Sequence, residues 1–253
     1  MQPPKVVSHD EWLKARSELL AIEKQFTRER DALTQRRMAM PWERVEKNYL
    51  FDTPEGKRTL AELFEGRRQL LVQHFMFGPG WEQGCPSCSF MADHADGMNV
   101  HLRHRDVTFV AVSRAPLAEI ERFRGRMGWQ FKWVSSNGTR FNYDFGVSFT
   151  PEEVATGKVQ YNYSDGQWPH PHEELPGISV FYQNDSGGIF HTYSTYGRGV
   201  EVMMGTYNML DLTPQGRDED NLRFTMEWVR HHDRYEPQPA SKATAGSCCA
   251  AHT

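Results

Sequence analysis

Apolar residues near the start of the chain recur at helical spacing. Between residues 8 and 37, charged side chains surround an apolar stripe made of Trp12, Leu19, Leu20, Ile22, Phe26 and Leu33. Ser8 and Glu11 match the signature of a capping box, and Pro41 is expected to stop the helix because proline lacks a backbone donor. The pattern predicts one long helix that either packs on its own domain or serves as a lid or dimer contact.

The middle of the chain alternates between strand-like and helix-like patterns. Strands are expected at residues 49–52, 69–77, 106–113 and 131–136, and helices at 59–64, 85–105 and 116–127. The second and third strands are almost continuously apolar, which is typical of strands buried on both faces. The order predicts an α/β fold with parallel central strands and flanking helices.

The second half of the chain has a weaker pattern. Residues 137–175 are rich in Gly, Asn, Tyr and Pro, and they predict an inserted irregular and β segment with one short helix near 151–155. Two apolar runs on either side of residues 184–187 predict a β-hairpin. Further helices are predicted at 200–210 and 221–231.

These patterns divide the chain into three parts. We expect an N-terminal helical extension over residues 1–45, a main domain over 46–235 that contains the insertion at 137–175, and a tail over 236–253. The tail is rich in Ala, Ser, Thr and Gly, a composition that predicts flexibility.

Charge and hydropathy narrow the class of protein. The 253 residues include 29 basic and 33 acidic ones, mixed along the chain, with a net charge of −4. This argues against binding to nucleic acid or to an anionic membrane surface. No apolar run approaches the roughly 20 residues of a membrane span, and the first residues lack the apolar core of a secretory signal. A cytoplasmic location is expected.

The four cysteines form two close pairs, Cys85/Cys88 and Cys248/Cys249. The first pair stands where an apolar strand gives way to a helix, and Pro86 suits the first helical position. Unpaired N–H groups of a first helical turn stabilise a thiolate, and two cysteines one turn apart can form a disulfide. The motif predicts dithiol–disulfide exchange in which Cys85 attacks, Cys88 resolves, and the disulfide is the only redox group required.

A Cys-x-x-Cys pair can also be half of a metal site. His170 and His172 precede Pro176, and either histidine would complete a copper or zinc site with Cys85 and Cys88. A metal carrier is therefore the alternative to an oxidoreductase, and a redox-inactive interaction module is a third possibility. The tail cysteines, beside His252, would pass electrons to the first pair, bind a soft metal or have no function.

Two side chains near the motif are candidates for proton transfer. His74 lies in the strand that leads to the cysteines, where its imidazole would exchange protons with them, although a single histidine on an apolar strand is more often a hydrogen-bonded core residue. Glu82 would take a proton from Cys88 during resolution, although a loop carboxylate at this place can simply be solvated.

Several long motifs resemble one bacterial family. They are residues 70–77 followed by Trp81 and the cysteine motif, 107–116, 126–136 and 142–146. The chain resembles the thioredoxin-like superfamily and, more closely, the DUF899 family, from Ser8 to Arg234. The resemblance implies a thioredoxin-like central sheet flanked by helices, and a thiol or disulfide substrate that is either a protein or a small molecule.

The superfamily resemblance also implies a cis-proline that faces the cysteine pair, and Pro176 before residues 178–181 matches that position. An ordinary trans turn is the alternative. Peroxiredoxins place Thr or Ser three residues before the peroxidatic cysteine, whereas this chain has Glu82 there. This difference argues against peroxide reduction, and thiol peroxidase activity stays a further alternative to disulfide exchange because Arg114 or Arg140 would supply a charge near the cysteines.

Overall fold

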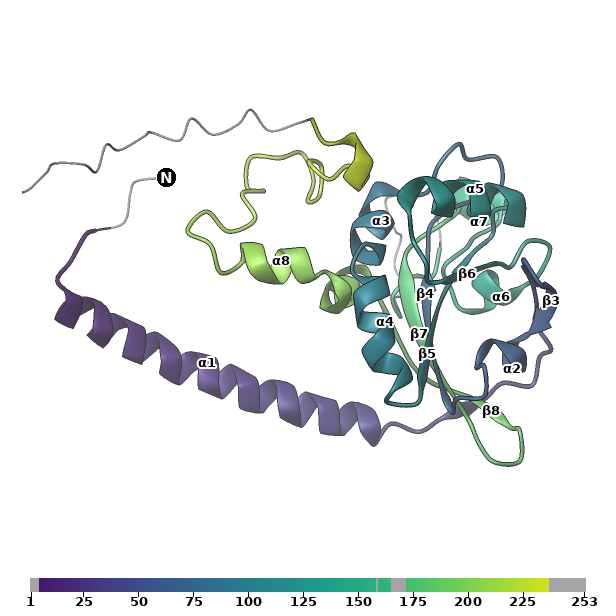
Figure 1. Cartoon of the computed structure of the whole chain (residues 1–253), viewed down its shortest axis with the longest axis horizontal. Coiled ribbons are helices and arrows are strands. Elements are labelled where there is room, and N and C mark those ends of the chain that lie inside the picture. Colours follow the sequence, from purple (N-terminus) through teal and green to yellow (C-terminus); the bar gives the residue numbers. More distant parts are fainter. Residues whose placement is uncertain (1–4, 158, 165–171, 237–253) are drawn as a thin grey trace, which may run out of the picture.

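The computed structural model describes residues 5–157, 159–164 and 172–236, and an eight-stranded sheet lies at the centre of the body (Figure 1). The strand order is β1-β8-β7-β4-β5-β6-β2-β3. The strands are β1 (Glu43–Arg44), β2 (Leu50–Thr53), β3 (Gly56–Thr59), β4 (Gln69–His74), β5 (Val107–Ser113), β6 (Lys132–Ser135), β7 (Gly177–Gln183) and β8 (Ile189–Tyr196).

Helices connect these strands and cover both faces of the sheet (Figure 1). They are α1 (His9–Met38), α2 (Leu60–Leu63), α3 (Pro86–Ala92), α4 (Ala95–Arg103), α5 (Leu117–Met127), α6 (Phe141–Asp144), α7 (Pro151–Thr156) and α8 (Gly205–Leu210), with short 3-10 helices η1 (Gly197–Met203) and η2 (His232–Arg234). In the described ranges, no helix is both long and apolar enough to cross a bilayer.

The direction of the strands defines the fold. Strands β4, β5 and β6 are parallel, and helices α3, α4 and α5 form the crossovers between them. The hairpin β7–β8 then joins the other edge of β4 in antiparallel orientation. Parallel β-α-β units followed by an antiparallel hairpin form the thioredoxin-like arrangement, so the predicted fold class is confirmed.

Alternating side chains of the central strands build a core on each face. In β5, Phe109 and Ala111 join the cluster under α3, α4 and α5, whereas Val110 and Val112 join the cluster under α2 and α6. This alternation explains why β5 reads as a continuous apolar run.

Helix α1 has the predicted capping box but not the predicted packing on its own domain. The Ser8 hydroxyl accepts the Glu11 N–H, and the Glu11 carboxylate accepts the Ser8 N–H. None of its residues is buried, and the helix extends away from the body (Figure 1). The last turn of the helix meets β8, with the Arg37 guanidinium carbon 5.4 Å from the centroid of the Tyr193 ring, and the chain after the helix is fixed to the sheet where Trp42 contacts Tyr182 and β1 pairs with β8. A lid or dimer role stays a prediction.

Two predicted helices differ from the structure in detail. The helix expected at 85–105 is broken between α3 and α4 at Asp93, whose carboxylate accepts hydrogen bonds from the indole of Trp129 and from His232. The helix expected at 200–210 is divided into η1 and α8.

The helix predicted at residues 221–231 is wrong, because this segment forms turns and bends. Met226 has a φ of 67°, which a right-handed helix excludes. Its backbone N–H instead donates to the Glu219 carboxylate, which also accepts a hydrogen bond from the indole of Trp228.

The described part of the predicted insertion contains two short helices and two isolated β-bridges, Ser148–Glu174 and Tyr161–Ser164, in place of the expected short strands. The expected short helix is α7, and α6 precedes it. A separate cluster of buried side chains packs the insertion against the start of β7 and the end of β8. It contains Val147, Phe149, Val159, Tyr161, Leu175 and Tyr196.

Candidate active site

The cysteine motif lies where β4 gives way to α3. Cys85 occupies the N-cap position of α3, and Pro86 is its first helical residue, as predicted. The N–H of Cys85 donates to the carbonyl of Met76 at 3.0 Å, which fixes the loop to the end of the strand. Cys85 is half-buried and Cys88 is buried, so Cys85 is the more accessible of the two to an incoming substrate.

Hydrogen bonds at the motif separate the acidities of the two thiols. The Cys88 thiol donates to the Cys85 sulfur, and backbone N–H groups of Cys88 and Ser87 are further donors, which together lower the pKa of Cys85 to about 7 despite its burial. The same hydrogen bond, together with burial and the negative charge on Cys85, raises the pKa of Cys88. Cys85 is therefore the thiolate and Cys88 the protonated partner.

Contacts from both ends of the domain hold the loop. The Gln73 amide donates to the Cys88 carbonyl at 3.1 Å, and the Met76 N–H donates to the Cys88 sulfur at 3.5 Å. From the C-terminal segment, His231 Nε2 donates to the carbonyl of Gly84 at 2.8 Å. The loop that carries Cys85 is thus supported by residues far apart in the sequence.

Gly84 is required by close packing rather than by its backbone angles. A Cβ at this position would lie 2.6 Å from a ring carbon of Phe75 and 2.9 Å from one of Phe123, and both rings are buried. We expect Gly84→Ala to lower the free energy of unfolding by about 1 to 3 kcal/mol through overpacking. Urea denaturation monitored by circular dichroism measures this change.

Gly97→Ala is the matched control, because Gly97 lies in α4 and a Cβ there would meet nothing within 4 Å. Alanine at an open helical position is expected to stabilise the protein by about 0.5 to 1 kcal/mol. Equal stability of the two variants would contradict the role given to Gly84.

A cleft of about 940 Å³ opens in front of the cysteines. Next to the motif its walls are apolar, and they contain Met76, Met91, Pro176, Val200, Met204 and Met226. Residues from 211 to 220 form a second, strongly polar part of the wall. The cleft is large enough for a small molecule or a short peptide segment.

Pro176 lies in this cleft wall together with Cys85 and Cys88. Its expected cis peptide bond is wrong, since the described residues contain no cis bond. The chain here needs no tight turn: the Leu175 N–H bonds to Val147, and β7 begins at Gly177. The Pro176 carbonyl accepts the hydroxyl of Tyr161 at 2.6 Å.

The two predicted proton-transfer residues do not line the cleft. The imidazole of His74 packs against Phe141 and Phe145 in the core of the opposite face, where its Nε2 lies 2.8 Å from the Ser179 hydroxyl. Burial lowers the pKa of His74 to about 3, so the ring is neutral. Glu82 is exposed. Their proposed roles stay predictions without a contact to either cysteine.

A buried carboxylate that the sequence did not single out acts on the motif. Glu174 is 1% exposed, and its negative charge contributes to the raised pKa of Cys88. Its carboxylate accepts Arg114 Nε at 2.5 Å and the Ser148 hydroxyl at 2.7 Å. Burial nevertheless raises the pKa of Glu174 above its usual value. The only feature of the sequence that could have pointed to Glu174 is its position two residues before Pro176.

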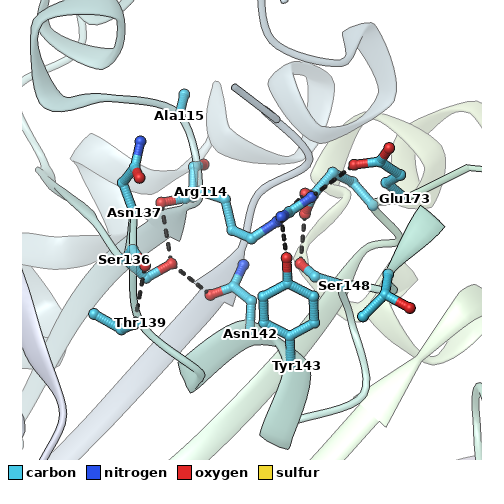
Figure 2. Close-up of polar contacts among 12 residues, drawn as sticks. Arg114, Ala115, Ser136, Asn137, Thr139, Asn142, Tyr143, Ser148 and Glu173 are labelled. Carbon is cyan, nitrogen blue, oxygen red and sulfur yellow. Dashed lines mark hydrogen bonds and ion pairs between the residues drawn. The ribbon is translucent and has the colours of Figure 1, made fainter. Parts of the chain in front are cut away.

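Arg114 is the centre of this polar cluster. Figure 2 shows its guanidinium reaching toward Tyr143 and toward Glu173, with Ser148 beside them. The Arg114 side chain is 11% exposed and does not line the cleft. The cluster therefore lies behind the part of the cleft wall that contains Pro176 and does not contact a substrate in the cleft.

The metal hypothesis receives no further ligand from the described residues. Within these residues, no group of three or more His, Cys, Asp or Glu side chains is placed to hold an ion. His172 is exposed, whereas His170 and the tail residues Cys248, Cys249 and His252 lie outside the described ranges. Copper or zinc binding stays a hypothesis.

Solved structures with similar chain traces include proteins of thiol chemistry. Peroxidoxin BcpB from Mycobacterium tuberculosis is 13% identical, with a TM-score of 0.44 over 66% of this chain and 95% of that one. A candidate thiol:disulfide interchange protein DsbE from Chlorobium tepidum is 10% identical, with a TM-score of 0.40 over 66% and 98% of the two chains. None of the curated proteins matches this chain.

The strand order and the thiol pair define the class: a thioredoxin-like protein with a Cys-x-x-Cys motif at the start of a helix. Within that class the chain belongs to the family described as bacterial protein of unknown function (DUF899), whose family model matches residues 1–235. The family resemblance seen in the sequence is thereby confirmed.

Proposed function

We propose that the protein is a dithiol–disulfide oxidoreductase. The observation that supports this function best is the unequal thiol pair. The half-buried Cys85 has a lowered pKa, and the buried Cys88 donates a hydrogen bond to it in the wall of a cleft that has both apolar and polar parts. A nucleophile that is thiolate near neutral pH and a protonated neighbour within bonding reach are the two groups that disulfide exchange requires.

The reaction proceeds in two exchanges. The Cys85 thiolate attacks one sulfur of the substrate disulfide, which forms a mixed disulfide and releases the other substrate sulfur as a thiolate that takes a proton from water. Cys88 then loses its proton and attacks the Cys85 sulfur, which releases the second substrate thiol. The substrate gains two electrons and two protons, and the protein is left with a Cys85–Cys88 disulfide.

The order of attack follows from exposure and acidity. Cys88 is buried, so a substrate disulfide reaches Cys85 first. Once Cys85 is bonded to substrate, its negative charge is gone, and one cause of the raised pKa of Cys88 disappears with it. Attack by Cys88 is therefore favoured only after the mixed disulfide has formed.

The test uses pre-reduced protein in which Cys248 and Cys249 are replaced by serine, mixed with bis(2-hydroxyethyl) disulfide. Peptide mass mapping is expected to find a Cys85–Cys88 disulfide. The rate is expected to rise with pH, to be half-maximal near pH 7 and then to level off, because the protonated Cys85 thiol below its pKa of about 7 does not attack.

Two results would overturn this function. One is that Cys85 remains a free thiol after exposure to disulfides. The other is rapid oxidation of Cys85 by hydrogen peroxide combined with no reaction with disulfides, which would identify a thiol peroxidase instead.

A further inference from the structure

The walls of the cysteine cleft carry an excess of negative charge. The charged residues that line the cleft are five carboxylates, Glu201, Asp211, Asp218, Glu219 and Asp220, and two arginines, Arg198 and Arg217. A cleft with low-dielectric walls concentrates the field of such charges on whatever enters it.

Both arginines are already neutralised by two of the carboxylates. Arg217 contacts both oxygens of Asp211 at 2.8 Å, lies 3.1 Å from Glu201, and stacks on the Tyr207 ring with its guanidinium carbon 3.9 Å from the centroid. Arg198 Nε lies 2.8 Å from Glu201. The two arginine charges are offset by the charges of Glu201 and Asp211, so the net charge of the lining is set by the other three carboxylates.

The other three carboxylates that line the cleft are not paired with either arginine. Among the described residues, no basic group forms an ion pair with Asp218, Glu219 or Asp220. Glu219 is a structural acceptor for the Tyr207 hydroxyl at 2.6 Å and for Trp228 at 2.7 Å. Asp218 and Asp220 are exposed, so their charge is available to a ligand.

We infer that the cleft selects disulfides that carry positive charge, such as those of aminothiols or of basic peptide segments. The inference rests on the proposed disulfide exchange and adds its substrate class. Met76 and Met204 offer the disulfide an apolar contact in this cleft, where polarizable thioethers suit sulfur, and Asp218 and Asp220 in the lining of the same cleft attract the positive charge that the substrate carries. Dianionic disulfides are repelled by the same carboxylates.

Three disulfides of equal chain length test the selectivity: cystamine, which is cationic, bis(2-hydroxyethyl) disulfide, which is neutral, and dithiodipropionate, which is anionic. The protein is pre-reduced, and its Cys248 and Cys249 are replaced by serine. For each disulfide, the second-order rate constant with this protein is divided by the rate constant of the same disulfide with free mercaptoethanol. This removes the intrinsic reactivity of each disulfide. We expect cystamine to exceed dithiodipropionate by about tenfold at low ionic strength. In 1 M salt, where the Debye length is about 3 Å, the ratio should approach one.

The variant Asp218→Asn/Asp220→Asn is expected to lose most of the ratio and to keep the rate with the neutral disulfide. Asparagine tolerates the positive φ of 51° at position 218. Asp10→Asn/Asp31→Asn on helix α1 changes the net charge equally, outside the cleft, and should keep the ratio.

A cystamine preference no larger than twofold, or one that survives Asp218→Asn/Asp220→Asn, would overturn the charge selectivity. If the neutral disulfide fails to oxidise Cys85 and Cys88, the proposed function itself fails, so the two failures are distinguishable. A basic disulfide-bonded peptide, measured beside cystamine, distinguishes a protein substrate from a small-molecule substrate. Faster reaction of the peptide identifies a protein segment as the substrate, and faster reaction of cystamine identifies a small aminothiol disulfide.

Discussion

In pre-reduced protein whose Cys248 and Cys249 are replaced by serine, Cys88→Ser is expected to accumulate a stable mixed disulfide between Cys85 and its substrate, whereas Cys85→Ser is expected to react no faster than a protein-free control. The difference follows from position: Cys85 is the half-buried thiol with the lowered pKa, and Cys88 is buried behind it. A serine hydroxyl at position 85 is not a nucleophile for disulfides near neutral pH. Intact-mass spectrometry after mixing with bis(2-hydroxyethyl) disulfide detects the adduct.

The Ser87→Ala variant is the control for these substitutions, because it changes the same turn without removing a sulfur. It removes a hydroxyl that contributes to the lowered pKa of Cys85, so the reaction is expected to continue with its pH midpoint moved upward. An adduct that forms on Cys88 in the Cys85→Ser protein would reverse the assignment of nucleophile and resolving thiol.

Glu174→Ala is expected to lower the free energy of unfolding by about 3 to 5 kcal/mol. The substitution leaves the buried guanidinium of Arg114 with the half-exposed Glu173 as its remaining ionic partner, and breaking a buried ion pair from one side costs up to this amount. The Ser148 hydroxyl also loses its acceptor. Chemical denaturation at neutral pH measures the change, and rescue by the double variant Glu174→Ala/Arg114→Met would identify the unpaired charge as the cause.

Lys57→Ala provides the comparison with a surface ion pair. Lys57 Nζ lies 2.7 Å from Asp52, and the Lys57 side chain is 67% exposed. Solvent and salt screen such a pair, so its loss should cost less than about 1 kcal/mol. If Glu174→Ala costs no more than Lys57→Ala, the buried cluster does not stabilise the fold.

The centre of the fold is well predicted from the sequence because the apolar residues of its strands and helices are the residues that form the core. In β5, every residue after Val107 is buried, so the strand appears in the sequence as a continuous apolar run whichever elements pack against it. Strand β1, in contrast, consists of the polar pair Glu43 and Arg44, which becomes a strand only by pairing with β8. No local pattern predicts an edge strand of this kind.

The candidate site divides in the same way. Cys85 and Cys88 were predictable because strand, turn and helix patterns surround them, whereas Pro176 followed only from the resemblance to the thioredoxin-like superfamily; all three line the cleft. Glu174 was not, because its burial depends on Arg114, which is 60 positions away in the sequence. The turn around Met226 likewise depends on hydrogen bonds that converge on Glu219. Contacts between distant side chains leave no periodic signal.

Helix α1 affects how the protein will behave in hydrodynamic experiments. At a rise of about 1.5 Å per residue, its 30 residues span roughly 45 Å, and the helix extends away from the body (Figure 1). A single chain of this shape diffuses more slowly than a sphere of equal mass and leaves a gel-filtration column early. An early elution volume is therefore compatible with a monomer, and light scattering or sedimentation equilibrium is the appropriate measure of subunit number.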